Sequence, residues 1–85
     1  MANNVILRKI DLTEQWQKLS TVPLVGSVTI STAPANAAAV LMRSSEGIEV
    51  PWVAGEWHEF KRIDLSQIEV KGTAGDVVTV VGGTW

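Results

Sequence analysis

The chain has 85 residues, 46% of them hydrophobic, with a formal net charge of −2, one histidine and no cysteine. This balance does not suit a partner that is nucleic acid or a membrane surface, and no run approaches the roughly 18 apolar residues of a membrane helix. Disulfides are excluded and the stability margin of so short a chain is thin, so we expect one domain over residues 1–85 that works together with a partner.

The chain begins with an expected strand at residues 5–12, whose even-numbered positions form the more apolar face and should face a core. A short second strand is expected at residues 15–19. A helix over residues 12–19 is the alternative, because three apolar side chains there fall at helical spacing and Thr13 could cap it.

The next segment alternates in the manner of a half-buried strand over residues 24–31. Val28 and Ile30 should face inward, and the three hydroxyl residues between and beside them should face outward. Pro34 cannot donate a ladder hydrogen bond, so residues 32–37 should form a loop. Another strand is expected at residues 38–43.

The middle of the chain contains two further expected strands, separated by a turn at residues 54–55. The first covers residues 48–53 and contains Pro51, which indicates a sheet edge or an irregularity. The second covers residues 56–63, where apolar and charged side chains occur at both odd and even positions. Its buried face is therefore ambiguous.

The last segment starts with a tight corner at residues 64–66, followed by a short strand around Val70 and a loop at residues 72–76. Residues 77–81 are apolar at nearly every position, so we expect this strand to be covered on both faces. Seven or eight short strands with turn signals about every ten residues indicate an all-β fold. We expect a small antiparallel β-sandwich or barrel.

Reactive groups are scarce. Glu56 and His58 would share a strand face and could form half of a metal site or an acid–base pair. No further ligand and no nucleophile paired with a base are evident, so we interpret His58 as a surface residue. The glycines near the C-terminus lack the strand–glycine–helix context of a phosphate loop. We expect no cofactor, no metal and no enzymatic activity.

Four tryptophans in so short a chain are its least ordinary feature. Each can bury up to about 250 Å², which exceeds what one thin sandwich can conceal. We expect Trp16 and either Trp52 or Trp57 to belong to the core. The remaining tryptophans should be exposed, for contact with a protein or for stacking against a sugar ring.

Several short motifs resemble a group of small virion proteins of tailed bacteriophages. The matching stretches are Trp16-Gln17-Lys18-Leu19, Ser27-Val28-Thr29-Ile30, Ala54-Gly55-Glu56, Asp64-Leu65-Ser66-Gln67-Ile68-Glu69-Val70-Lys71-Gly72 and Thr73-Ala74-Gly75-Asp76-Val77-Val78. The charged and aromatic segment at residues 52–62 departs from the family pattern. The motifs are turn and strand signals rather than reactive groups, so the resemblance concerns the fold more than the role.

The resemblance implies a β-sandwich capsid decoration or cement protein that stabilises the shell. The expected partner is the major capsid protein or another virion protein, with the chain forming a homo-oligomer, a trimer being favoured. The expected location is the virion, after synthesis in the host cytoplasm. The alternative is a tail, head-fibre or connector component, with or without binding of a host-surface glycan. The residues expected at the protein interface are Val5, Ile6, Trp52, Trp57 and Trp85, together with the N-terminal arm at residues 1–6.

Overall fold

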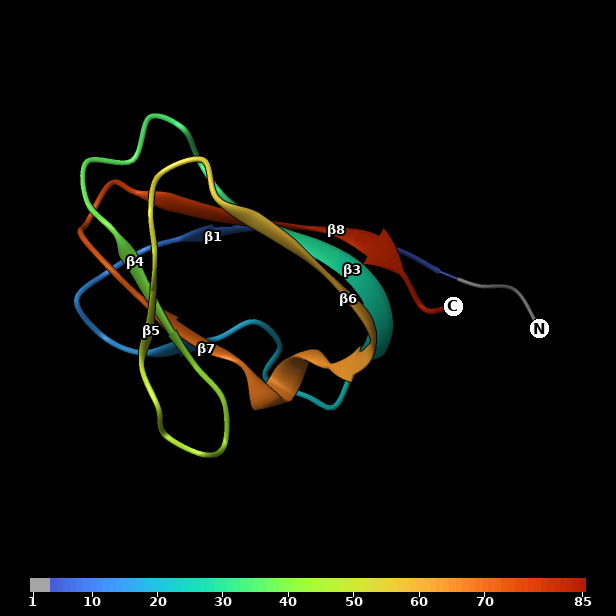
Figure 1. Cartoon of the computed structure of the whole chain (residues 1–85). Coiled ribbons are helices and arrows are strands. Elements are labelled where there is room, and N and C mark those ends of the chain that lie inside the picture. Colours follow the sequence, from blue (N-terminus) through green and yellow to red (C-terminus); the bar gives the residue numbers. More distant parts are fainter. Residues whose placement is uncertain (1–3) are drawn as a thin grey trace.

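The computed structural model describes residues 4–85, in which eight strands form two antiparallel sheets of four strands each (Figure 1). The first, here called the long sheet, has the strand order β1-β8-β3-β6; the second, the short sheet, has the order β2-β7-β4-β5. The expected all-β sandwich is confirmed, and the alternative helix over residues 12–19 is not formed. The elements are β1 (Val5–Asp11), β2 (Gln17–Lys18), β3 (Val25–Thr32), β4 (Val40–Arg43), β5 (Val50–Trp52), β6 (Trp57–Asp64), the 3-10 helix η1 (Leu65–Gln67), β7 (Glu69–Lys71) and β8 (Val77–Gly83).

The core lies between the two sheets and is built mainly from the inward faces of the strands, with Leu12, Leu19 and Leu65 added from the connecting segments. In β3, Val28 and Ile30 are buried, while the hydroxyl residues between and beside them are partly exposed, as the alternation predicts. The buried hydrophobic side chains are Ile6, Leu12, Leu19, Val28, Ile30, Val40, Met42, Trp52, Leu65, Val70, Val78 and Val80. Because β5 is the outermost strand of the short sheet, the edge position indicated by Pro51 is also confirmed.

A bulge interrupts the pairing of β3 with β6. Val28 lies opposite Phe60 and Gly26 lies opposite Ile63, so two residues of β6 stand across from Ser27 alone. One of these, Arg62, has a positive φ of 53°, and its backbone N–H donates to the Ser27 hydroxyl at 3.2 Å. The extra residue lets Phe60 and Ile63 both pack against the core, which explains why the sequence of this strand shows no single buried face.

The Asp64 carboxylate joins the end of β6 to the segment that precedes β3. It accepts hydrogen bonds from the backbone N–H groups of Leu24 (3.1 Å) and Ser66 (2.9 Å) and from the Ser66 hydroxyl (2.7 Å). The hydrogen bond from the Ser66 hydroxyl, followed by those from the two N–H groups, holds the pKa of Asp64 below its usual value. The corner expected at residues 64–66 is therefore a capped turn of 3-10 helix.

This cap predicts a contribution of Asp64 to acid sensitivity. A carboxyl with a lower pKa in the folded state stabilises the fold above its unfolded pKa of about 4, and this stabilisation is lost as the pH falls through the folded pKa. In Asp64→Asn, the free energy of unfolding should be lower at neutral pH and should decline less steeply below about pH 4. Urea unfolding at a series of pH values measures this slope, and an acid limb identical to that of the unmodified chain would contradict the assignment.

Within residues 4–85, no helix is both long and apolar enough to cross a membrane.

Candidate functional site

The outer face of the long sheet, which points away from the core, carries exposed apolar side chains. Val78 and Val80 of β8 are buried, but Val81 is 51% exposed on the opposite face. Beside it on the edge strand β1 lie Val5 and Leu7, exposed by 68% and 70%. The expectation that residues 77–81 are covered on both faces is therefore wrong for the single chain described by residues 4–85. The apolar character of this face suits burial against another molecule.

Trp85 lies over the end of this face. A Cβ atom placed on Gly83 would overlap the six-membered ring of the Trp85 indole, so the bare glycine backbone forms the floor on which the ring rests. The Ser27 hydroxyl donates to the Trp85 carbonyl oxygen at 2.6 Å, and the Thr84 N–H donates to the Asn4 carbonyl at 2.9 Å. The Trp85 backbone is thus held by β3, and its neighbour Thr84 by the residue that precedes β1, while 54% of Trp85 remains exposed.

Gly83→Ala should displace this indole without unfolding the chain. The new methyl group meets an indole rather than backbone, and a side chain that is 54% exposed has room to rotate away. We expect a red shift and lower intensity of the Trp85 fluorescence and a change below about 1 kcal/mol in the free energy of unfolding. Trp85→Ala provides the reference spectrum that lacks this indole. A Gly83→Ala spectrum identical to that of the unmodified chain would show that the ring does not rest on Gly83.

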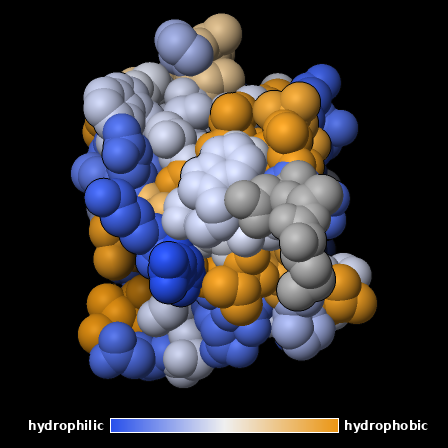
Figure 2. All heavy atoms as spheres, turned by 90° about the vertical axis from the view of Figure 1, so that its right-hand side faces the viewer, coloured by the Kyte–Doolittle hydropathy of each residue, from blue (hydrophilic) through white to orange (hydrophobic). Residues whose placement is uncertain are grey.

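An open hollow of about 550 Å³ lies beside Trp85. Glu59, Lys61 and Arg62 of β6 line one side of it, and Thr29 and the other central residues of the sheet contribute to its lining. Figure 2 views the end of the sandwich that lies on the right in Figure 1, and it shows apolar side chains (orange) gathered beside strongly polar ones (blue). The hollow therefore combines an aromatic wall with hydroxyl, carboxylate and cationic groups.

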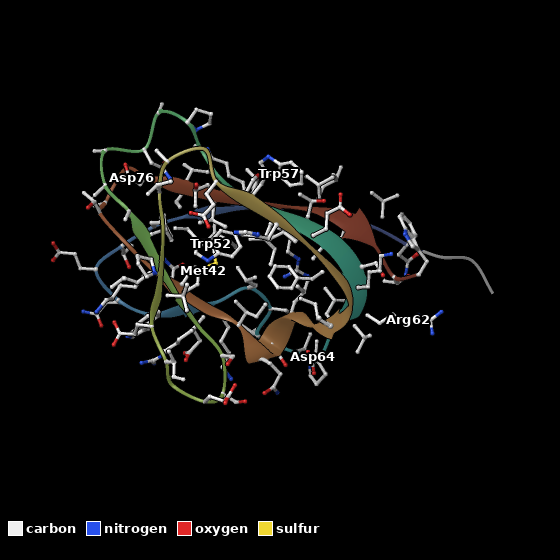
Figure 3. All side chains as sticks on the ribbon, viewed as in Figure 1. Met42, Trp52, Trp57, Arg62, Asp64 and Asp76 are labelled. Carbon is white, nitrogen blue, oxygen red and sulfur yellow. The ribbon has the colours of Figure 1, made fainter. Side chains whose placement is uncertain are left out.

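Trp57 belongs to the same outer face. It pairs with Ser31 of β3, whereas Trp85 is tied to Ser27, so the two positions lie about 13 Å apart along the strand direction. Trp57 is 59% exposed, and Figure 3 shows it on the outside of the sheet while Trp52 points between the sheets. Both highly exposed tryptophans of the chain thus share one face.

Of the residues expected at an interface, three are exposed on this outer face: Val5 and Trp85 near one end of it, and Trp57 on the opposite edge strand β6. The side chains of Ile6 and Trp52 are buried in the core, at 5% and 6% exposure, so their side chains are not part of the exposed surface. The expected N-terminal arm at residues 1–6 falls partly on residues 1–3, which lie outside the described residues.

Leu7 and Val81 belong to the exposed surface and were not singled out from the sequence. The signal for Leu7 was present: it is an apolar residue at an odd position of a strand whose even positions face the core. Val81 is also apolar, but it ends the valine-rich run at residues 77–81, in which both faces of the strand are apolar. Trp16, expected in the core, is half-buried, and its ring lies 4.0 Å from the Arg43 guanidinium carbon and 5.0 Å from the Lys71 ammonium.

His58 and Glu56 do meet, with 2.7 Å between His58 Nε2 and Glu56 Oε2. This hydrogen bond, together with one from the Val53 N–H, lowers the pKa of Glu56 below its usual value. The His58 ring also packs edge-on against Trp52 at 4.7 Å. Within residues 4–85 there is no group of three or more histidine or acidic side chains arranged to hold a metal ion. The pair stabilises the turn between β5 and β6.

An apolar groove of about 350 Å³ opens between the edge strands β5 and β6, where the two sheets separate. Phe60 and Trp52 stack in parallel within it, with their ring centroids 6.4 Å apart. Figure 3 shows Met42 and Trp52 pointing into the space between the sheets. The apolar residues that line the groove are Met42, Ile48, Val50, Trp52, Phe60 and Ile68.

Comparison of the chain with protein-family models, with curated proteins and with solved structures finds no match.

Proposed function

We propose that this chain is a structural binding module of a phage particle, a capsid decoration protein that docks on the major capsid protein or another virion protein through the outer face of the long sheet. The observation that carries the proposal is the apolar outer side of β8 and β1. Val81, Leu7 and Val5 face solvent in the single chain, beside the fixed indole of Trp85. The resemblance of the sequence motifs to small virion proteins supplies the class of partner.

The physical basis is removal of this surface from water. Apolar area contributes roughly 25 cal/mol per Å² when buried, and a specific protein contact buries about 1,000 Å² or more in total. Three of the four apolar side chains, those of Val5, Leu7 and Val81, lie on the paired neighbouring strands β1 and β8, and Trp85 follows two residues after the end of β8. They form a rigid, preorganised surface, which lowers the entropic cost of docking. Repetition over a shell gives each capsid many such contacts. The proposal assigns the chain no reaction and no cofactor.

Leu7→Glu tests the proposed docking face. A carboxylate at this exposed position leaves the core unchanged but would be buried without a partner in the contact, which should reduce occupancy of the particle at least tenfold. The measurement is the copy number bound to particles of the encoding phage after incubation with purified protein. Val53→Glu is the matched control, because Val53 is 64% exposed and lies in the turn between β5 and β6.

A copy number close to that of the shell subunits supports decoration. A small copy number, such as that of a single ring of subunits, would assign the chain to a connector or tail. Normal binding of Leu7→Glu together with loss of binding by Val53→Glu would place the contact elsewhere. Absence of binding by the unmodified chain to particles would overturn the proposal.

A second candidate function is favoured by the hollow beside Trp85. An exposed indole next to Glu59, Arg62 and Thr29 offers a stacking surface with hydrogen-bonding groups at its margin, which is the arrangement that a sugar ring requires. On this view the chain is a tail, head-fibre or connector component that binds a host-surface glycan. Titration of the Trp57→Phe variant with host cell-wall saccharides reports on Trp85 with less background fluorescence. A silent titration that also leaves particle binding intact would eliminate this candidate.

A further inference from the structure

The free edge of β6 is open to another strand. Among residues 4–85, β6 is the outermost strand of the long sheet and pairs with β3 alone. The Thr32 N–H donates to the Glu56 carbonyl at 2.9 Å, which fixes the alternation of the ladder. Counting from that pair, His58 and Phe60 direct their backbone groups toward β3, so Glu59 and Lys61 direct theirs away from the sheet. Such unpaired N–H and C=O groups form a template for a further strand.

The charges on this edge are self-complementary. Glu59 and Lys61 flank Phe60 and are both exposed. If two copies meet antiparallel with a two-fold axis at Phe60, each Glu59 lies directly opposite the partner subunit's Lys61. Opposite charges in such cross-strand positions stabilise the pairing. Moving the axis to Glu59 or to Lys61 places like charges opposite each other, which is destabilising. The side chains therefore select one register.

We propose that two copies of this chain associate through antiparallel pairing of their β6 strands, with the two-fold axis at Phe60. Glu59 and the partner's Lys61 exchange backbone hydrogen bonds, and the symmetric pair does the same, which joins two four-stranded sheets into one continuous sheet. An isologous contact of this kind closes at two copies. The edge thus favours a pair over the three-fold cluster expected from the sequence.

The apolar groove between β5 and β6 adds hydrophobic burial to this contact. Phe60 lines this groove, and in a non-hydrogen-bonded antiparallel pair the two Phe60 Cα atoms would lie about 4.5 Å apart. Ile48 and Val50, which line the same groove, are 67% and 49% exposed in the single chain. A second copy on this edge would cover the mouth of the groove and part of this surface.

The length of the contact is limited by the structure of β6 itself. The positive φ of Arg62 in the bulge ends the regular edge just after Lys61, and the turn at Val53–Glu56 ends it on the other side. A short edge gives a small interface, so the association should depend on concentration. The pairing does not depend on the proposed docking function, although it would place two outer faces side by side and allow bivalent attachment.

Charge exchange at the two positions tests the register. Sedimentation of the purified chain at low salt should show a monomer–dimer equilibrium. Glu59→Lys alone and Lys61→Glu alone should each weaken dimerisation at least tenfold, because each creates two like-charge pairs. An equimolar mixture of the two variants should form a heterodimer, since every cross-strand pair is again of opposite sign. Glu14→Lys, which makes the same charge change at an exposed position between β1 and β2, the edge strands farthest from β6 and β5, is the matched control and should dimerise normally.

The outcomes separate this pairing from docking and from misfolding. Circular dichroism and tryptophan fluorescence of each single variant should match those of the unmodified chain. An unmodified chain that stays monomeric at about 1 mM protein would overturn the proposal. So would dimers whose stability is unaffected by both single substitutions, or variants that fail to associate when mixed. Because the measurement uses the purified chain alone, loss of particle binding without loss of dimers would count only against the docking face.

Discussion

Gly82→Ala should destabilise the fold more than any other small substitution in the long sheet. Gly82 lies in β8 between Ile6 of β1 and Val28 of β3. A Cβ atom at Gly82 would overlap the Ser27 carbonyl oxygen and would lie 2.6 Å from the Val28 Cα. These are backbone atoms of a paired strand, which cannot move aside as the end of a side chain can.

The expected cost is about 3 kcal/mol or more, the upper range for overpacking. In a domain of this size such a loss lowers the melting temperature by about 12 to 24 °C. Calorimetry or thermal circular dichroism measures it. The neighbouring Gly83→Ala is the matched control, since its methyl group meets the Trp85 side chain instead of backbone. Equal melting temperatures for the two variants would contradict the close approach of β3 and β8 at Gly82.

The strands themselves could be predicted from local patterns, because each alternates between a buried and a solvated face. The region of β3 is the simplest case: Val28 and Ile30 face the core as expected. The bulge in β6 could not be predicted, because it depends on how many residues of β6 stand opposite Ser27, and this count is a property of the pairing. In a regular strand, Phe60 and Ile63 would point to opposite faces because they are three residues apart. The bulge allows both to pack against the core.

The candidate site was predicted in part. The apolar run at residues 77–81 predicted burial on both faces of the strand. In residues 4–85, only the face that carries Val78 and Val80 is buried. An apolar pattern indicates that a strand face is buried, but it does not indicate whether the same chain or a partner buries it. The role of Gly83 could not be predicted either, because a Gly-Gly dipeptide is typical of a turn. In the structure its second glycine packs against the Trp85 ring, where a Cβ atom would overlap the ring. That contact requires the chain to fold back over its own strand.

The choice between Trp52 and Trp57 could not be made from sequence because both flank the same turn and neither adjoining strand pattern identifies a single buried face. Geometry decides it. Trp52 ends the edge strand β5 and points between the sheets, where it stacks on Phe60 and meets the edge of His58. Trp57 begins β6 on the opposite side of the long sheet and faces solvent.

This difference yields the second large expected effect. Trp52→Ala should cost about 3 to 5 kcal/mol, because it removes a buried indole and leaves a cavity between Met42 and Phe60. Trp57→Ala is the same chemical change at an exposed site and should cost less than about 1 kcal/mol. Urea unfolding of both variants, with the unmodified chain as reference, measures the difference. Similar losses in the two variants would contradict the assignment of Trp52 to the core.

The same pair of variants separates stability from binding. Trp57→Ala should retain the fold while removing an exposed indole from the outer face of the long sheet, so any loss of particle binding would come from the contact itself. Trp52→Ala should lose occupancy only under conditions in which part of the chain is unfolded, and the loss should be reversed by cooling toward the temperature of maximum stability. Binding measured over a temperature series distinguishes the two. A Trp52→Ala variant that is fully folded yet does not bind would instead indicate that the groove between β5 and β6 contacts the particle.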